Sequence, residues 1–169
     1  ADPQPAEAPV VVFLHGWGGT APRVYGAWLE HIVRKGYIVI YPRYQASLFT
    51  AAPDMAPAAL QAIQDALARL TAEGPVRPMT DRLAWVGHSL GGVISANLAA
   101  AYADNGLPRP AVLMCVAPGG EARLPVAPLD GLPTDTLVLL VVGDADHAVS
   151  DQGATAILNR LAHMPTANV

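Results

Sequence analysis

Short apolar runs alternate with longer amphipathic stretches along the whole chain. The apolar runs are rich in Val, Ile and Leu and are bounded by glycine, proline or polar residues, which is typical of buried strands. Five of them are predicted to be strands: Val10–Leu14, Tyr37–Tyr41, Leu83–Val86, Ala111–Val116 and Leu137–Val142. Because these runs are continuously apolar, they predict a parallel sheet that is covered on both faces.

The stretches between the predicted strands carry apolar residues at helical spacing. Leu60, Ile63 and Leu67 share one face of such a stretch, with polar residues opposite. Four helices are predicted: Pro22–Val33, Ala58–Ala72, Val93–Ala103 and Asp151–Ala162. Strands and helices that alternate in this way predict an α/β fold, namely a three-layer α/β/α sandwich with a mostly parallel sheet.

A single domain is predicted over residues 1–169, because the sequence shows neither an internal repeat nor a linker. The Pro- and Ala-rich residues 1–9 have no periodicity and are expected to form an extended N-terminal arm.

Composition narrows the class of protein. The chain is 52% apolar with a mean hydropathy of +0.31, yet every apolar run is far shorter than the roughly 18–20 residues of a membrane-spanning helix. No transmembrane segment is therefore expected. The net charge is −4 and lysine and arginine form no cluster, which argues against nucleic acid as a partner. The oligomeric state is not indicated.

Two features bear on origin. The chain has 31 alanines and nine arginines against one lysine, Lys35, a bias typical of GC-rich bacterial genomes. It begins at Ala1 without a methionine. This start fits a mature exported protein from which a signal peptide has been removed, and it fits equally a sequence that was cut at an arbitrary position. The location stays open, with a secreted or periplasmic protein favoured over a cytoplasmic one.

The strongest chemical motif follows the third predicted strand. Gly87-His88-Ser89-Leu90-Gly91 matches G-x-S-x-G, with a strand before it and a helix after it. The two glycines leave room for a sharp strand-to-helix turn, which exposes the serine hydroxyl above the sheet. This context predicts that Ser89 is a nucleophile. The alternative is an ordinary glycine-rich turn.

A second motif, His15-Gly16-Trp17-Gly18-Gly19, follows the first predicted strand. With both motifs in this order, the chain from Val10 onward resembles the serine-nucleophile α/β hydrolases. It resembles their minimal, lidless members, because residues 117–135 are too few for a helical lid.

The resemblance implies roles for the motif residues. It implies an oxyanion hole made by two backbone N–H groups, those of Trp17 and Leu90. It also implies that several residues support the motif loops: His15, Gly16, Gly87, His88 and Gly91. His15 is expected to hold its loop by hydrogen bonding and not to act as a base.

The residues after the last predicted strand supply a candidate acid. Related hydrolases carry a G-x-x-D-x-x-V pattern there, which maps onto Gly143, Asp146 and Val149. Asp146 is favoured over Asp144 as the carboxylate that orients a histidine. A metal site is not expected, because no fourth ligand accompanies Asp144, Asp146 and His147. The sequence also lacks a nucleotide-binding motif, so no cofactor is expected.

The catalytic histidine is not evident. The resemblance implies a histidine after one further strand beyond the last helix. The chain has histidines at 15, 31, 88, 147 and 163, and none is in that position. We expect the C-terminal strand and the histidine to lie beyond residue 169; the alternative is a protein that has lost its base.

The predicted activity is carboxylic-ester hydrolysis of the esterase or lipase type, through an acyl-enzyme on Ser89. Small lidless esterases, lipases and cutinase-like enzymes are the members that the chain resembles, which implies a small-molecule or polymeric ester as substrate. The alternatives are a thioesterase or amidase of the same fold, or a non-catalytic binding or interaction protein. Tyr41-Pro42-Arg43-Tyr44 is expected to be a surface turn, or else part of the substrate groove.

Overall fold

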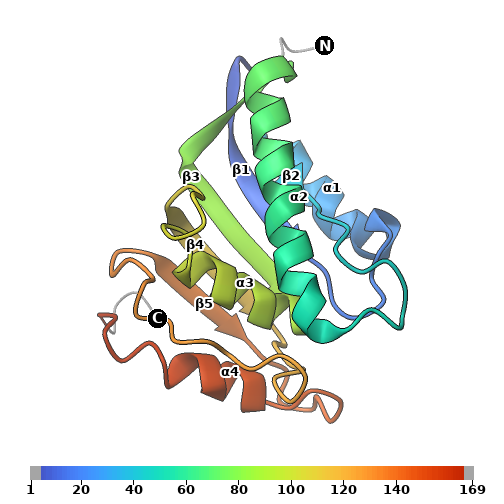
Figure 1. The fold of residues 1–169 in the computed structure, drawn as a ribbon, viewed down its shortest axis with the longest axis vertical. Helices are drawn as coiled ribbons and strands as arrows, with labels where there is room; N and C mark the ends of the chain where they lie inside the picture. Colours follow the sequence, from blue (N-terminus) through green and yellow to red (C-terminus); the bar gives the residue numbers. More distant parts are fainter. Residues whose placement is uncertain (1–4, 166–169) are drawn as a thin grey trace.

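The computed structural model describes residues 5–165 and contains one parallel sheet, drawn in Figure 1. The strands run in the order β2-β1-β3-β4-β5. Their bounds are β1 (Glu7–Leu14), β2 (Ile38–Ile40), β3 (Arg77–His88), β4 (Pro110–Val116) and β5 (Leu137–Val141). All five predicted strands are confirmed.

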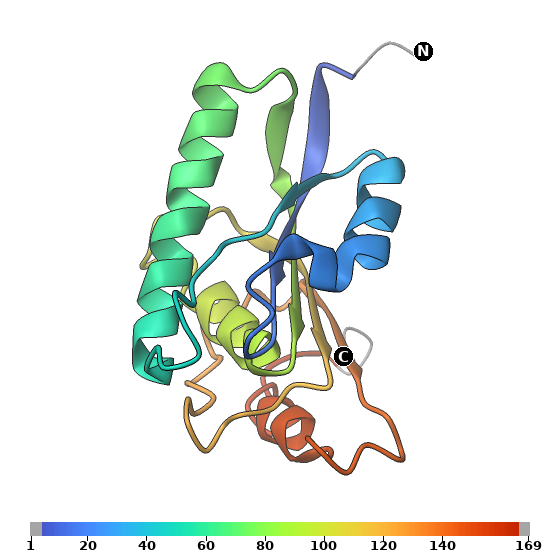
Figure 2. The same cartoon turned by 90° about the vertical axis from the view of Figure 1, so that its right-hand side faces the viewer.

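Helices lie on both sides of the sheet (Figure 2). A short 3-10 helix, η1 (Pro22–Tyr25), leads into the first α-helix, and the four α-helices are α1 (Gly26–Arg34), α2 (Ala52–Glu73), α3 (Leu90–Ala100) and α4 (Gln152–Leu158). α1 covers one face, and α2, α3 and α4 pack on the other. The structure therefore has the predicted three-layer α/β/α architecture of an α/β-hydrolase fold.

The register of the strands brings their carboxyl ends together. Leu14 at the end of β1 lies beside Gly87 near the end of β3. Val116 at the end of β4 lies beside His88 on one side and Val141 on the other. The loops that leave these four strands therefore meet at one edge of the sheet, where parallel α/β folds hold their sites.

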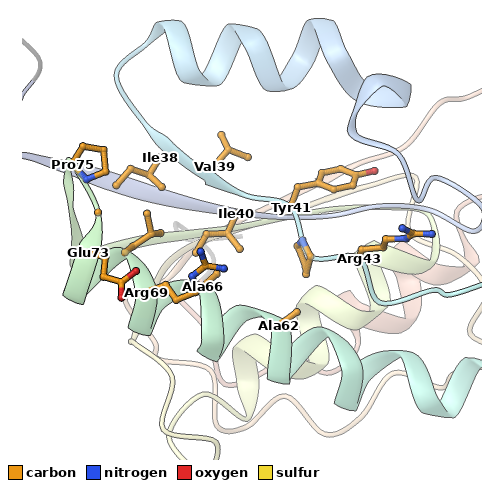
Figure 3. A pocket seen from close by; sticks show the side chains of 13 residues that line it. Ile38, Val39, Ile40, Tyr41, Arg43, Ala62, Ala66, Arg69, Glu73 and Pro75 are labelled. Carbon is orange, nitrogen blue, oxygen red and sulfur yellow. The ribbon is translucent and has the colours of Figure 1, made fainter.

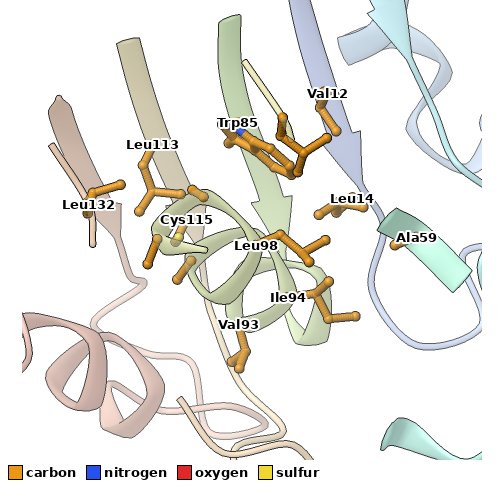
Figure 4. Packing of buried hydrophobic residues seen from close by; sticks show 14 of the residues in the cluster. Val12, Leu14, Ala59, Trp85, Val93, Ile94, Leu98, Leu113, Cys115 and Leu132 are labelled. Carbon is orange, nitrogen blue, oxygen red and sulfur yellow. The ribbon is translucent and has the colours of Figure 1, made fainter. Parts of the chain in front are cut away.

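The larger part of the core lies between the sheet and the helices α2 and α3. Trp85, Leu113, Ile94 and Leu14 are completely buried there, as Figure 4 shows. Cys115 belongs to the same cluster, and burial raises the pKa of its thiol to about 12. This cysteine packs as a small apolar residue.

On the opposite face, an aromatic cluster joins α1 to the centre of the sheet. Phe13 on β1 is fully buried and contacts the rings of Tyr25, Trp28 and Tyr41 at centroid distances of 4.9, 4.9 and 5.9 Å. Such pairs contribute about 0.5–1.5 kcal/mol each beyond the area they bury. This cluster places η1 next to the loop that follows β1.

The expectation that every strand is covered on both faces is wrong for β5. Leu137, Leu139 and Val141 are 53, 48 and 38% exposed, whereas Val138 between them is 3% exposed. Leu139 pairs with Met114, which packs on the α1 side of the sheet. The exposed row therefore lies on that face, because the nine-residue α1 packs over β1 and β3 and, within the described part of the chain, nothing covers β5.

The expected N-terminal arm also needs correction. Residues 1–4 lie outside the described residues, and β1 already begins at Glu7. Glu7 pairs with Arg77 in the sheet, and their side chains form an ion pair with an N–O distance of 2.7 Å. The register shifts directly after Pro9, since Pro9 pairs with Met79 and Val10 pairs with Leu83, which leaves three extra residues on the β3 side.

Helix boundaries differ from the prediction by up to six residues, most clearly in α2. This helix begins at Ala52 and contains Pro57. The missing N–H of Pro57 costs one hydrogen bond in the second turn, but Met55 and Ala59 on either side of it are fully buried. Burial of this face extends the helix through the proline.

No helix within residues 5–165 combines the length and the apolar character needed to cross a bilayer.

The difference in burial between β4 and β5 can be tested with one Leu→Ala substitution on each strand. Leu113→Ala removes a fully buried side chain of β4 and is expected to lower the free energy of unfolding by about 2–5 kcal/mol. Leu137→Ala removes a 53% exposed side chain of β5 and is expected to cost about 0.5 kcal/mol or less. Urea unfolding measures both, and equal losses would show that β5 is covered.

Candidate active site

Ser89 occupies the turn between β3 and α3 in a conformation that is unusual for a residue with a side chain. Its φ is 53° and its ψ is −126°. Backbone strain of this kind costs of order 1–3 kcal/mol and persists only where the surroundings enforce it. The Ser89 amide donates to the carbonyl of Val116 (3.0 Å), and the Ser89 carbonyl accepts from the amides of Gly92 (2.8 Å) and Gly119 (3.2 Å). These three bonds hold the turn in place.

The two motif glycines are required by space. A Cβ on Gly87 would lie 2.2 Å from the carbonyl oxygen of Gly91, and a Cβ on Gly91 would lie 2.2 Å from that of Leu14. Both obstacles are backbone atoms, which cannot rotate away. The first turn of α3 therefore packs directly on the end of β1.

The loop formed by His15–Gly19 lies beside Ser89. A Cβ on Gly16 would be 3.1 Å from the Cβ of Ser89. Three amides of this loop have acceptors: Gly16 donates to the hydroxyl of Tyr25 (2.8 Å), Gly18 to Oε1 of Gln45 (2.7 Å) and Gly19 to the carbonyl of Gly16 (2.9 Å). For the amide of Trp17, the described residues provide no acceptor.

Leu90 is the first residue of α3, so its N–H has no acceptor within the helix. The N–H groups of Trp17 and Leu90 are those expected to face an oxyanion, and they come from the two loops that meet at Ser89. Their role in binding an oxyanion stays a prediction.

His15 is part of the framework beneath the loop. Its ring is 1% exposed and stacks on Tyr44 at a centroid distance of 4.1 Å. Its Nδ1 donates to the carbonyl of Gly16 at 2.8 Å, and burial lowers its pKa, so the ring is neutral near pH 7. A buried, neutral ring stacked in this way suits support of the loop.

The sequence analysis missed a set of polar side chains that hold the His15–Gly19 loop. The hydroxyls of Tyr41 and Tyr44 donate to the carbonyls of Gly19 and His15. Tyr44 and Gln45 are 3 and 0% exposed, so the expectation of a surface turn after β2 is wrong. The signal was two tyrosines close together after a strand, since a buried tyrosine needs a partner for its hydroxyl.

Asp146 lies in the loop after β5 and is partly buried. Its Oδ1 accepts from the amides of Val149 (3.0 Å) and Ala148 (2.9 Å), and these bonds hold the pKa of Asp146 below its ordinary value. The same turn packs against Gly119, because a Cβ there would lie 2.2 Å from Val149. The Gly119 amide donates to the Ser89 carbonyl, so the loop that contains Asp146 and the serine turn are neighbours.

The histidines do not complete a triad in the described part of the chain. His31 is exposed on α1 and His147 is exposed beside Asp146. Nε2 of His163 donates to the carbonyl of Leu132 (3.1 Å), and Nδ1 of His88 lies 2.9 Å from the Tyr25 hydroxyl. Among residues 5–165, no histidine is hydrogen-bonded to Ser89 or to Asp146.

The entrance to the site carries apolar side chains. Trp17 is 37% exposed, and the guanidinium of Arg123 lies over its ring at 4.8 Å. Leu48 packs beside Gly18, and the neighbouring Phe49 is 96% exposed. A substrate at Ser89 would therefore meet a rim that is apolar, with one cation.

A separate pocket of about 570 Å³ lies between β2 and α2 (Figure 3). Its walls include Ile38, Ile40, Ala66 and Arg69. No residue of the two motif loops lines it, so this pocket and the residues predicted to be catalytic lie in different parts of the structure. We assign the site to the motif loops, because the strained serine lies there.

No cluster of three or more side chains suited to a metal is found in residues 5–165.

Comparison with known proteins identifies the family. A family model described as Chlorophyllase matches residues 2–124 of this chain. The chain belongs to the chlorophyllase family. A search of curated proteins found no match.

Solved structures share the fold of this family member. MGS-M1, an α/β hydrolase enzyme from a Medee basin deep-sea metagenome library, superposes with a TM-score of 0.73 at 21% identity, over 95% of this chain and 66% of its own. A bacterial heroin esterase superposes with a TM-score of 0.58 at 23% identity, over 69% of this chain and 37% of its own. Carboxyl esterase 2 of the fungus Tuber melanosporum superposes with a TM-score of 0.57 at 24% identity, over 68% of this chain and 38% of its own. This chain thus spans between 37 and 66% of the length of these three structures.

The close packing at the serine turn can be tested with one pair of variants. Gly91→Ala places a methyl group against backbone carbonyls and is expected to lower the free energy of unfolding by about 3 kcal/mol. Gly26→Ala in α1 is the control, because a Cβ there meets nothing within 4 Å; it is expected to be neutral or stabilising by about 0.5–1 kcal/mol. If thermal or urea unfolding shows equal effects, the packing of α3 on β1 is not as described.

Proposed function

We propose that this chain carries the nucleophile, the oxyanion hole and the acid of a serine carboxylic-ester hydrolase. The observation that carries the proposal is the strained conformation of Ser89 (φ 53°) beside a loop in which the Trp17 amide has no acceptor among the described residues. Both features cost stability. In acyl transfer they serve together, because the strained turn exposes the nucleophile and the unpaired amide can donate to the oxyanion.

The reaction proceeds in two steps. The Oγ of Ser89 attacks the ester carbonyl and loses its proton to a general base, and the carbonyl oxygen becomes an oxyanion. The amides of Trp17 and Leu90 donate to that oxyanion. The alcohol leaves with the proton, and an acyl-enzyme remains on Ser89. Water then attacks the acyl group, and the carboxylic acid and free serine are released.

Asp146 is the proposed acid that orients the base and stabilises its cationic form. Its short turn reaches Gly119, which is bonded to the Ser89 carbonyl. None of the five histidines of the sequence is bonded to Asp146 within the described residues, so we propose that the base is a histidine outside this sequence, in the complete gene product.

The apolar rim formed by Trp17, Leu48 and Phe49 favours an ester with a large apolar group. The family name, chlorophyllase, makes chlorophyll one test substrate. Esters of p-nitrophenol with increasing acyl length are the others. The rim predicts a preference for the longer acyl groups.

A second candidate is a non-catalytic binding protein with the same fold. The observation that favours it is the absence, within residues 5–165, of a histidine bonded to Asp146. The reading frame beyond codon 169 distinguishes the two: a further apolar strand followed by a histidine supports the hydrolase, and a stop codon supports the binding protein.

Replacement of Ser89 tests the nucleophile in the complete gene product. Ser89→Ala is expected to reduce kcat for p-nitrophenyl butyrate by about 10⁶-fold, to the level of background hydrolysis. It should also abolish covalent labelling by a fluorophosphonate, measured by intact-protein mass. Ser95→Ala is the matched control, because Ser95 is buried in α3. Labelling that survives in Ser89→Ala would exclude Ser89 as the nucleophile.

Separate replacement of Asp146 and Asp144 tests which carboxylate orients the catalytic base. Asp146→Asn is expected to lower kcat by about 10³–10⁴-fold, because the amide cannot stabilise an imidazolium. Asp144→Asn should stay within about twofold of wild type. Since hydrogen bonds lower the pKa of Asp146, it stays ionised as the pH falls, and the acid limb of the kcat profile should follow the histidine. A larger loss in Asp144→Asn would reverse the assignment.

A further inference from the structure

The Tyr25 hydroxyl joins the two loops that meet at the candidate site. It accepts from the amide of Gly16 at 2.8 Å and lies 2.9 Å from Nδ1 of His88. Gly16 precedes Trp17 and His88 precedes Ser89, so one oxygen atom is bonded to the neighbour of the proposed oxyanion donor and to the neighbour of the proposed nucleophile. Tyr25 belongs to neither loop; it ends η1.

The direction of the bridge depends on the tautomer of His88. The Tyr25 oxygen has one proton and already accepts from Gly16. Burial lowers the pKa of His88, although the charge of Asp146 acts in the opposite direction. The imidazole is therefore neutral near pH 7, with one protonated and one unprotonated nitrogen. We assign the unprotonated position to Nδ1, because among the described residues it is the only acceptor within hydrogen-bond distance of the Tyr25 hydroxyl proton. The chain of hydrogen bonds runs from the Gly16 N–H through Tyr25 to His88.

The ring of Tyr25 is itself fixed. Its centroid lies 4.9 Å from that of Phe13 and 5.7 Å from that of the His88 ring, which it meets at an interplanar angle of 64°. Burial also raises the pKa of its hydroxyl, so the proton is retained at physiological pH. A held ring with a retained proton is a rigid spacer between the two loops.

Space around the bridge is small. A Cβ on Gly16 would lie 3.0 Å from Nδ1 of His88, 3.1 Å from the Cβ of Ser89 and 3.2 Å from the Tyr25 hydroxyl. The two loops are thus in contact, and a small shift of the Gly16 peptide would move the Trp17 amide relative to Ser89. Errors of about 1 Å in such geometry cost about 10²-fold in rate.

We propose that Tyr25 is a positioning residue, which sets the distance between the oxyanion loop and Ser89 through its bonds to Gly16 and His88. This proposal rests on the proposed function. The effect acts on kcat, because the alignment matters in the transition state, while ground-state binding of the ester depends on the apolar rim.

Tyr25→Phe tests the bridge in the complete gene product. Phenylalanine keeps the packing against Phe13 and removes only the oxygen. We expect kcat for p-nitrophenyl butyrate to fall by about 10- to 100-fold with KM within about twofold. Tyr37→Phe is the control, because Tyr37 is 41% exposed, and it should leave both parameters unchanged.

His88 supplies a second pair of variants, which keeps the test decisive if Tyr25→Phe does not fold. In His88→Asn the side-chain amide oxygen would stand close to the place of Nδ1, so this variant retains an acceptor for Tyr25, whereas His88→Leu has similar bulk and none. We expect His88→Asn to stay within about threefold of wild-type kcat and His88→Leu to lose about 10-fold or more. A role in packing alone would make the two variants equal.

The outcomes separate this inference from the proposed function. If the wild-type protein hydrolyses no ester and takes up no fluorophosphonate, the proposed function fails. If the wild type is active and Tyr25→Phe keeps its kcat, so that any loss of kcat/KM comes only from a raised KM, the positioning role is overturned. Equal kcat values for His88→Asn and His88→Leu overturn it as well.

Discussion

The contact between the first turn of α3 and the end of β1 is the constraint on which the rest of the site depends. Gly91 lies so close to the carbonyl of Leu14 that no other side chain fits. This contact brings the loop after β1 and the turn after β3 to one place on the sheet edge, where Leu14 and Gly87 already pair. The strained backbone of Ser89 follows from it, because the chain must leave β3 and enter α3 within one residue. A looser turn would relieve the strain and separate the two loops.

Around this contact, aromatic side chains provide the rigidity that a glycine-rich loop lacks. Glycine loses more conformational freedom on folding than any other residue, so His15–Gly19 would be costly to order alone. Tyr25, Tyr41 and Tyr44 approach it from two elements, each with an apolar ring in contact with neighbours and a hydroxyl on the loop backbone. The three hydroxyls bond the Gly16 amide and the carbonyls of Gly19 and His15, whereas the Trp17 amide has no acceptor among the described residues. The loop is ordered by side chains that lie outside the recognisable motif.

Much of the fold followed from the sequence, because hydrophobic periodicity reports burial directly. The five strands, the four helices and the parallel sheet are confirmed. Periodicity could not report what lies beyond each face, so the exposure of Leu137 and Leu139 was missed. Nor could it place Tyr44 and Gln45, whose burial depends on a loop 25 or more residues earlier in the chain. The motif residues were found by spacing, while the side chains that hold them were not, since they act through three-dimensional contacts. The sequence therefore located the two motif loops that the structure brings together, and it did not identify the side chains that support them.

The uncovered face of β5 has a consequence for how the protein behaves in solution. β5 is an outer strand of the described sheet, and its sequence Leu-Val-Leu-Leu-Val contains no charged residue or proline. Natural sheets protect such strands with charges or prolines, because an open edge with an apolar face is a template for another strand. The nearby Asp135 is already paired with Arg109 and adds little repulsion. Within the described part of the chain, β5 is therefore the edge most open to pairing, and in the complete gene product the further strand that we propose beyond residue 169 would pair with it. Self-association through β5 is expected only in a chain that lacks this strand.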